Sequence, residues 1–98
     1  MERGEGFLAL NEVLSALADK TGRAILQKLR EGKINSGDLA KAVGLSPQAL
    51  SYHLSKLKNA GLIYETKEKN FIYYELDLTV LDEAIVWIST LKGGKDDE

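Results

Sequence analysis

The stretch SGDLAKAVGLSPQALSYHLSKL, residues 36–57, contains two short helical patterns separated by Gly44-Leu45-Ser46. Ser36 is expected to cap the first helix. Ser46 is expected to cap the second, with Pro47 at its first position, where the missing N–H costs nothing. Gly44 suits the turn because Gly adopts positive φ without strain. Two helices joined by a three-residue turn that contains Gly are typical of a helix-turn-helix, which we expect over residues 36–58.

The second helix of this motif has an unusual outward face. Its apolar residues form one narrow stripe at i, i+4 and i+7, namely Leu50, Leu54 and Leu57. The opposite side carries small or amide-bearing side chains, and there is no acid between Ser46 and Ala60: Gln48, Ala49, Ser51, Tyr52 and Ser55. Short donors and acceptors can approach base edges, so this face favours DNA reading. The alternative is the polar surface of an all-helical bundle.

Length and composition restrict the other classes. Ninety-eight residues, 44% of them hydrophobic, are enough for a single domain with a modest core, which we expect over residues 1–98. The chain has no Cys, which excludes a disulfide framework, a thiolate metal site and a Cys nucleophile. No apolar run approaches the roughly 18 residues of a membrane span, and the acidic N-terminus is unlike a signal peptide. We therefore expect a soluble, cytoplasmic protein without membrane insertion.

Charge is distributed unevenly along the chain. The net charge is −2, which at first argues against a nucleic-acid partner. However, Lys20 to Lys69 carries ten Lys/Arg against four Asp/Glu, whereas residues 1–19 and 70–98 together carry three against eleven. A basic middle with acidic ends is compatible with DNA contact on one face, although it also arises by chance in short chains.

After the helix-turn-helix, the spacing and type of the apolar residues change. Residues 62–67 and 71–76 are aromatic and β-branched, which predicts a two-stranded hairpin over 62–76. Its turn requires positive φ at Lys69 or Asn70. A hairpin directly after a recognition helix is the wing of a winged helix. Its tip carries Lys67 and Lys69, which suit phosphate or minor-groove contact, but the neighbouring Glu68 leaves a simply solvated tip as the alternative.

Two apolar helices are predicted at the ends of the chain. The first covers residues 7–18, after a Gly-rich tip that we expect to be unstructured. Asp19 or Thr21 then caps a second helix, and Ile34 is expected to be a short apolar tether. The last helix covers residues 79–92, opening with a capping box at Thr79 and Asp82 and closing at Gly93-Gly94, before an acidic tail of residues 95–98.

The last helix has more apolar residues than one face can bury, which indicates a partner surface, most simply a second copy of the chain. The alternative is a monomer with some exposed apolar residues. The expected dimer interface combines residues of the first and last helices: Phe7, Leu10, Leu14, Leu81, Ile85, Trp87, Ile88 and Leu91. The predicted fold class is thus mainly α, an α+β winged helix-turn-helix with about five helices and a two-stranded wing, dimeric through its terminal helices.

From Leu17 onward the chain resembles the ArsR-type winged helix-turn-helix repressors. Residues 16–26, ALADKTGRAIL, resemble the family's opening motif, and residues 50–57, LSYHLSKL, followed by residues 60–63, AGLI, resemble its recognition helix. The segment FIYYEL, residues 71–76, and the Trp-bearing last helix resemble the SdpR-like autorepressors most closely. Tyr52 stands where the family often has His, so the base sequence read is expected to differ.

The chain departs from the metal sensors of this family. Metal sensors of the family use Cys pairs, or Asp and His on the last helix, whereas this chain has no Cys and its last helix offers Asp82 and Glu83 without His. The single His53 cannot build a transition-metal site, so no metal or cofactor is expected. We expect His53 to pack partly against the core, with its polar edge facing a phosphate or a neighbouring helix.

The sequence therefore predicts a dimeric (auto)repressor that occludes a promoter and binds an imperfect palindrome in double-stranded DNA. Phosphates would contact Lys/Arg side chains and the helix N-termini at Ser36 and Ser46. The rival is a winged-helix protein-interaction module that does not bind DNA. Enzyme activity is not expected, because no carboxylate pair, nucleophile–base pair or phosphate-binding Gly loop is present. Three modes of release stay open: constitutive autoregulation, sequestration by a protein partner, and a small ligand at the dimer interface.

Overall fold

Five helices and three strands make up residues 2–93, which are the residues that the computed structural model describes; side chains are described from Leu10 onward. In chain order the elements are α1 (Glu2–Ala18), α2 (Lys20–Leu29), β1 (Ile34–Asn35), α3 (Ser36–Val43), α4 (Pro47–Asn59), β2 (Ile63–Glu68), β3 (Phe71–Leu76) and α5 (Thr79–Gly93). None of these helices is both long and apolar enough to cross a membrane.

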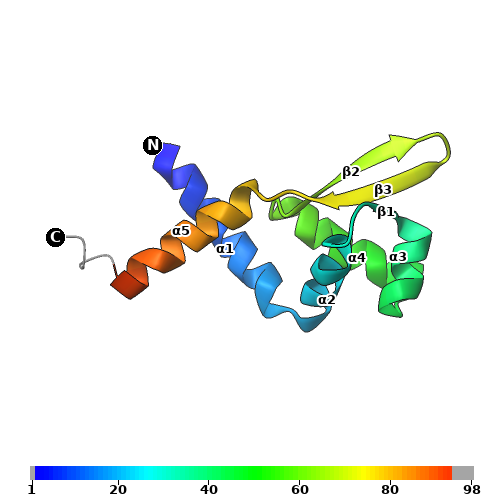
Figure 1. The fold of residues 1–98 in the computed structure, drawn as a ribbon, viewed down its shortest axis with the longest axis horizontal. Coiled ribbons are helices and arrows are strands. Elements are labelled where there is room, and N and C mark those ends of the chain that lie inside the picture. Colours follow the sequence, from blue (N-terminus) through cyan, green and yellow to red (C-terminus); the bar gives the residue numbers. More distant parts are fainter. Residues whose placement is uncertain (1, 94–98) are drawn as a thin grey trace.

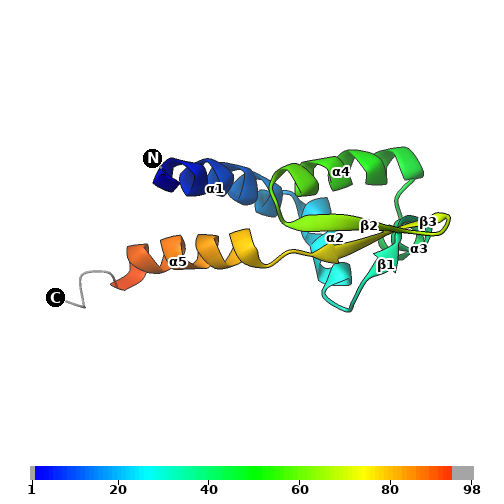
Figure 2. The same ribbon diagram turned by 90° about the horizontal axis from the view of Figure 1, so that it is seen from above.

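The elements form an elongated molecule of 53 × 25 × 21 Å. Helices α1 and α5 cross and pack against each other at one end, and the β2–β3 hairpin projects at the other (Figures 1 and 2). The helix-turn-helix of α3 and α4 lies beside the hairpin. The two ends of the described chain are therefore on the side remote from the hairpin tip.

One hydrophobic core joins the helices to the base of the hairpin. Its most deeply buried large side chains come from five different segments: Val13, Ile25, Leu39, Leu57 and Leu62. Burial of a side chain of this size contributes roughly 1.5–3 kcal/mol. Helix α4 contributes the stripe of leucines that its i, i+4, i+7 spacing predicts, all three of them buried. The core therefore fixes which side of α4 is left for a partner.

The sheet has three strands, so the prediction of a two-stranded wing is wrong. Strand β1 pairs antiparallel with β3, with Ile34 opposite Tyr74 and Asn35 opposite Tyr73, and the strand order is β1-β3-β2. Ile34, expected to be a tether, is thus a strand residue that also packs against the core. Two residues are too few to show the alternation that identifies a strand in a sequence.

The start of α2 agrees with the prediction, whereas the starts of α3 and α5 differ from it. Asp19 caps α2, and it was one of the two residues predicted to do so. Asn35, and not Ser36, caps α3: its Oδ1 accepts from the Asp38 amide at 2.9 Å, because the chain leaves β1 there in an extended conformation. The Thr79 amide donates to Asp77 Oδ1 at 3.1 Å, so Thr79 is the first residue of α5 and not its cap.

The N-terminal helix is longer than predicted. It begins at Glu2, so the Gly-rich segment expected to be unstructured is helical as far as the structure describes it. The acidic tail of residues 95–98 lies outside the described residues. In the hairpin, Lys69 has φ 56° and so takes the positive-φ position that was expected at Lys69 or Asn70.

Candidate nucleic-acid interface

The turn between α3 and α4 sets the direction in which α4 begins. Gly44 ends α3 with φ 71° in the left-handed region, and its amide is bonded to the carbonyls of the last α3 turn. Ser46 then caps α4, its Oγ accepting from the Ala49 amide at 3.1 Å, and Pro47 follows at the first helical position. These contacts fix the start of α4, whose outward face is exposed.

The predicted base-reading residues lie on the solvent side of α4. Gln48, Ser51, Tyr52 and Ser55 are exposed, while Ala49 is half-buried. The buried leucine stripe of α4 lies on the other side, against the core. Thus the residues that the sequence singled out lie on one side of α4, and four of the five are exposed.

A hollow of about 430 Å³ lies between α4, the start of α3 and β3. It brings Ser36, from α3, next to Ser51 and Ser55, from α4. Ser46 and Gln48 are outside this hollow, nearer the start of α4. The hollow could receive a phosphate, because the N-terminus of α3 and the hydroxyls of Ser36, Ser51 and Ser55 line it.

Lys58 also lines this hollow and was not among the predicted site residues. Its Nζ donates to Glu65 Oε1 at 2.9 Å, and this hydrogen bond raises the Lys58 pKa despite partial desolvation. Lys58 follows Ser51 and Ser55 at helical spacing, which could have identified it from the sequence. Its pairing with Glu65 reduces the positive charge that it offers to DNA.

Tyr52 is the most exposed aromatic residue of α4, with 61% of its surface accessible. Lys56, one turn later, places its Nζ 5.6 Å from the centre of the Tyr52 ring. The His53 ring meets the Tyr52 ring edge-on, with centroids 5.1 Å apart. Lys56 is therefore a second cation that the prediction missed, although its i+4 spacing from Tyr52 was visible in the sequence.

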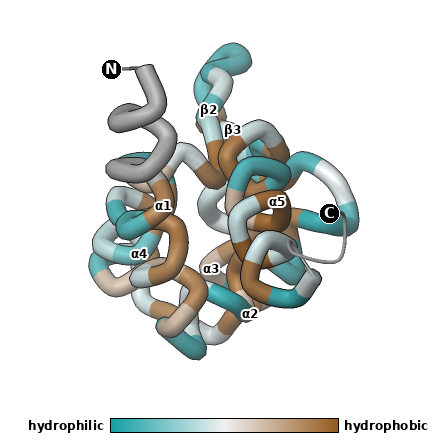
Figure 3. Tube along the Cα trace, turned by 90° about the vertical axis from the view of Figure 1, so that its left-hand side faces the viewer, coloured by the Kyte–Doolittle hydropathy of each residue, from teal (hydrophilic) through white to brown (hydrophobic). Residues whose placement is uncertain are grey.

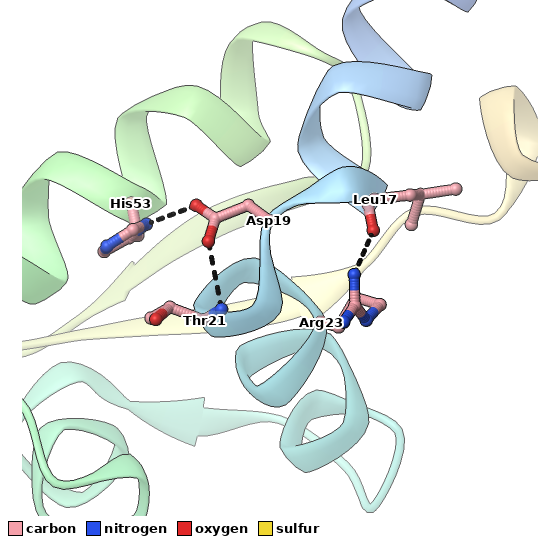
Figure 4. Close-up of polar contacts among 5 residues, drawn as sticks. All are labelled: Leu17, Asp19, Thr21, Arg23 and His53. Carbon is pink, nitrogen blue, oxygen red and sulfur yellow. Dashed lines mark hydrogen bonds and ion pairs between the residues drawn. The ribbon is translucent and has the colours of Figure 1, made fainter.

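The polar edge of His53 faces the start of α2, a neighbouring helix, which was one of its two predicted positions. Nδ1 of His53 lies 3.1 Å from Oδ2 of Asp19, and Oδ1 of Asp19 accepts from the Thr21 amide at 3.0 Å (Figure 4). On the other side of the same junction, Arg23 Nη1 donates to the Leu17 carbonyl at 2.8 Å. These contacts connect the end of α1, the start of α2 and the middle of α4.

The hairpin presents its two predicted lysines to solvent. Lys67 and Lys69 are both exposed near the tip. Glu68, between them, accepts from Lys33 Nζ at 2.6 Å, and this hydrogen bond raises the Lys33 pKa despite partial desolvation. Lys33 also lies 5.2 Å from the centre of the Tyr73 ring. Glu68, which counted against DNA contact by the hairpin tip, is thus paired with a lysine from outside the hairpin.

Among the described side chains, no three His, Cys, Asp or Glu residues come together as a metal site would require. The His53–Asp19 pair has two candidate ligands only, and Asp19 already accepts a backbone hydrogen bond.

The predicted dimer residues fall into two groups. Leu14, Ile85, Ile88 and Leu91 are exposed, whereas Leu10 and Leu81 pack against the chain's own core and Trp87 is half-buried. The side chain of Phe7 lies outside the described residues. Val86, 65% exposed, lies in the same apolar run but was not among the predicted dimer residues. Figure 3, viewed from the end that holds α1 and α5, shows apolar segments along both helices.

Two exposed hydroxyl groups of α5 donate hydrogen bonds within their own helix. Ser89 Oγ donates to the Ile85 carbonyl at 2.9 Å, and Thr90 Oγ1 donates to the Trp87 carbonyl at 2.6 Å. Both hydroxyls are therefore satisfied within their own helix. Ile85, Val86, Ile88 and Leu91 are the exposed large apolar side chains of α5.

Comparison with known proteins gives a consistent result. Residues 19–65 match the model of a family described as "Bacterial regulatory protein, arsR family". The transcriptional repressor SdpR of Bacillus subtilis is 38% identical over 89 residues, which span 89% of this chain and 99% of that protein. Among solved structures, NolR from Sinorhizobium fredii has a TM-score of 0.70 and 33% identity, covering 94% of this chain and 92% of that one.

A more distant neighbour has the same architecture. It is a winged helix-turn-helix DNA-binding domain from Mycobacterium bovis, described as homodimeric, with a TM-score of 0.73. It covers 100% of this chain and 93% of that chain. At 23% identity this likeness extends to the fold alone.

Proposed function

The chain belongs to the ArsR family of bacterial regulatory proteins, with a winged helix-turn-helix DNA-binding domain, and from this we propose that it is a dimeric repressor of transcription. It would bind duplex DNA in a promoter, its own included, and exclude RNA polymerase by occupying the site. The observation that carries this proposal is the exposed, acid-free face of α4, and the exposed Lys67 and Lys69 of the hairpin add to it. The repressor role is supported by the similarity to SdpR.

In this proposal α4 enters the major groove. Gln48 would pair bidentately with adenine through its amide, and Ala49 would touch a thymine methyl. Ser51, Tyr52 and Ser55 would contact bases or the sugar–phosphate edge next to them. Because these side chains are uncharged, they can approach base edges without electrostatic repulsion.

Phosphate contacts would surround the base-reading face. Ser36 and Ser46 stand at the starts of α3 and α4, where free backbone N–H groups favour an anion. Lys67 and Lys69 would contact the backbone on the hairpin side. Lys56 and Lys58 add positive charge along α4. Such contacts set affinity and register, and the α4 side chains set the base preference.

Dimerisation would present two α4 helices to successive major grooves. The half-sites of an imperfect palindrome would then lie about 34–36 Å apart. The support for a dimer is the apolar surface of α5 that this chain leaves uncovered, since Ala84 is the one α5 residue in the described chain that is fully buried. Solvent exposure of Ile85, Val86 and Leu91 in a monomer would be unfavourable.

The rival function is a winged helix that binds a protein and not DNA. The overall charge of −2 is compatible with it. The absence of acids on the outward face of α4 favours DNA. Salt dependence separates the two functions, because phosphate contacts release counterions and their affinity falls steeply with salt.

The test is binding of the purified protein to duplex DNA from upstream of its own coding sequence, by fluorescence anisotropy across a range of salt concentrations. A scrambled duplex of the same composition is the control. We expect preference for the upstream duplex and a steep negative slope of log affinity against log salt. Equal binding to both duplexes at every salt concentration would contradict sequence-specific repression.

A further inference from the structure

A pocket of about 240 Å³ lies where the connection from β3 to α5 passes α2. Its volume is just below the range of about 300–1,000 Å³ that is usual for drug-sized ligands, so its occupant would be small. Leu78, at its edge, is 54% exposed although it is apolar. The apolar lining consists of six leucines: Leu17, Leu26, Leu62, Leu76, Leu78 and Leu81.

Charged groups lie at the rim of this leucine pocket. Arg23 and Arg30 line it from α2, and Asp77 lines it from the β3–α5 connection. Arg23 is held in place, because its Nη1 donates to the carbonyl of Leu17 (Figure 4), and its remaining N–H groups are left for other acceptors. Asp77 Oδ1 accepts from the Thr79 amide. Two guanidinium groups against one carboxylate leave the rim positive.

We propose that the leucine pocket binds a small amphiphile that carries one carboxylate and a short apolar chain. The chain would leave water for contact with the leucines, and the carboxylate would accept hydrogen bonds from Arg23 or Arg30. A neutral amphiphile would lose the charged hydrogen bonds, and a cationic one would be repelled. The charge of the rim therefore selects the class of ligand.

The position of the leucine pocket gives such a ligand a regulatory role. Its lining joins α2 to the ends of α1 and α5, the helices of the proposed dimer. At its N-terminus, α2 holds Asp19 against His53 of α4. A ligand that favours one arrangement of these elements would change the DNA affinity by its preference for that arrangement. This regulatory part rests on the proposed function, whereas the binding site itself does not.

Direct binding is the first test. The full-length protein is titrated with octanoate, octanol and octylamine below their aggregation concentrations, followed by calorimetry and by amide NMR shifts. We expect one saturable octanoate site with shifts around Leu26 and Leu78, weaker binding of octanol, and the weakest binding of octylamine. Absence of saturable octanoate binding, or equal affinity for octanol, overturns the proposal.

Two variants locate the site. Arg30→Gln should weaken octanoate binding by about tenfold, the effect of one charged hydrogen bond. Lys28→Gln is its control, since Lys28 is on the same helix but does not line the pocket. Leu78→Asp, at an exposed position, should abolish binding through repulsion, with the exposed Ala24→Asp as its control. Unchanged binding in both test variants overturns the assignment.

A final comparison separates the site from the repressor function. DNA binding is measured with and without saturating octanoate, and a shift of at least about fivefold is expected. If the protein binds octanoate but no DNA, the proposed ligand site stands and the proposed repressor function is contradicted. DNA binding that octanoate leaves unchanged overturns the regulatory part. If a monomeric variant binds octanoate and the dimer does not, a second copy fills the pocket, which also overturns the proposal.

Discussion

Nδ1 of His53 lies 3.1 Å from Oδ2 of Asp19, so the helix proposed to read DNA contacts the residue that starts α2. The two oxygens of Asp19 have different partners, because Oδ1 accepts from the Thr21 amide. Both side chains are partly covered, with 17% of His53 and 27% of Asp19 exposed. One carboxylate therefore caps α2 and also lies against the His53 ring, against which the Tyr52 ring packs.

Two substitutions at Asp19 separate these roles. Asp19→Asn keeps an acceptor for the Thr21 amide but removes the charge that faces His53, whereas Asp19→Ala removes both. We expect the melting temperature at pH 7 to fall slightly for Asp19→Asn and by several degrees for Asp19→Ala. Thermal unfolding followed by circular dichroism measures both. Equal stability of the two variants would show that the cap contributes nothing.

The pH dependence of this effect has a defined direction. Partial burial raises the Asp19 pKa, but the Thr21 amide and the charges of His53 and Lys56 outweigh it, and the net pKa is below the ordinary 3.8. A carboxyl with a lowered folded-state pKa stabilises the fold above its unfolded pKa, and this contribution is lost as the pH falls through the folded pKa. The stability difference between Asp19→Asn and the parent should therefore shrink below pH 3.8.

Two glycines with positive φ provide a matched pair. A Cβ on Gly61, φ +79°, would lie 3.2 Å from Cγ1 of Val80, whereas a Cβ on Gly44, φ +71°, would meet no atom within 4 Å. Gly44→Ala should therefore cost the backbone penalty alone, about 1–2 kcal/mol, and Gly61→Ala more than that. Denaturant unfolding measures the difference. In a Val80→Ala background the excess at Gly61 should decrease and the cost at Gly44 should not.

Most of the fold could be predicted from local signals. The leucine stripe of α4, its Ser46 cap and the Gly44 turn identified the helix-turn-helix because each depends on residues close in sequence. Strand β1 was missed because its pairing with Tyr73 and Tyr74 is long-range and only two residues long. Asn35 was missed as a cap because the neighbouring Ser36 is an equally good candidate in sequence.

The candidate site was predictable in its composition and less so in its electrostatics. Exposure of Gln48, Ser51 and Tyr52 follows from helical periodicity. The pairing of Lys33 with Glu68 does not, because it joins a loop to the hairpin and depends on the sheet register. The contact of His53 with Asp19 is also tertiary. Sequence patterns identify the side of a helix that faces solvent, but not which distant charges neutralise one another.

Removal of the Gln48 amide tests base reading. Gln48→Ala should reduce discrimination between operator variants at one position by about 1–3 kcal/mol, because a bidentate pair with a base is lost. Competition anisotropy with a set of single-base operator variants measures this. Gln27→Ala, an exposed glutamine of α2, is the control and should leave the preference unchanged. An unaltered profile in Gln48→Ala would rule out base reading by this residue.

Neutralisation of the hairpin tip tests phosphate contact. Lys67→Gln and Lys69→Gln should each weaken binding to all duplexes alike and reduce the slope of log affinity against log salt by about 1. Base preference should stay the same, because phosphates carry no sequence information. Lys92→Gln, on α5 at the opposite end of the molecule, is the control. Loss of sequence preference with an unchanged salt slope would instead indicate base contact by the tip.

Disruption of the apolar side of α5 tests the dimer. Ile85 is 54% exposed in the single chain, so Ile85→Asp should leave the fold of each protomer almost unaffected, within about 0.5 kcal/mol. At an interface the same change would bury a charge without a partner, which is strongly unfavourable. We therefore expect Ile85→Asp to be monomeric at micromolar concentration in analytical ultracentrifugation and to lose most of its operator affinity. Ile72→Asp, an apolar-to-acid change on the hairpin, should remain dimeric. If the parent protein sediments as a monomer, the proposed dimer does not form. If the Ile85→Asp variant stays dimeric, the dimer contact lies elsewhere.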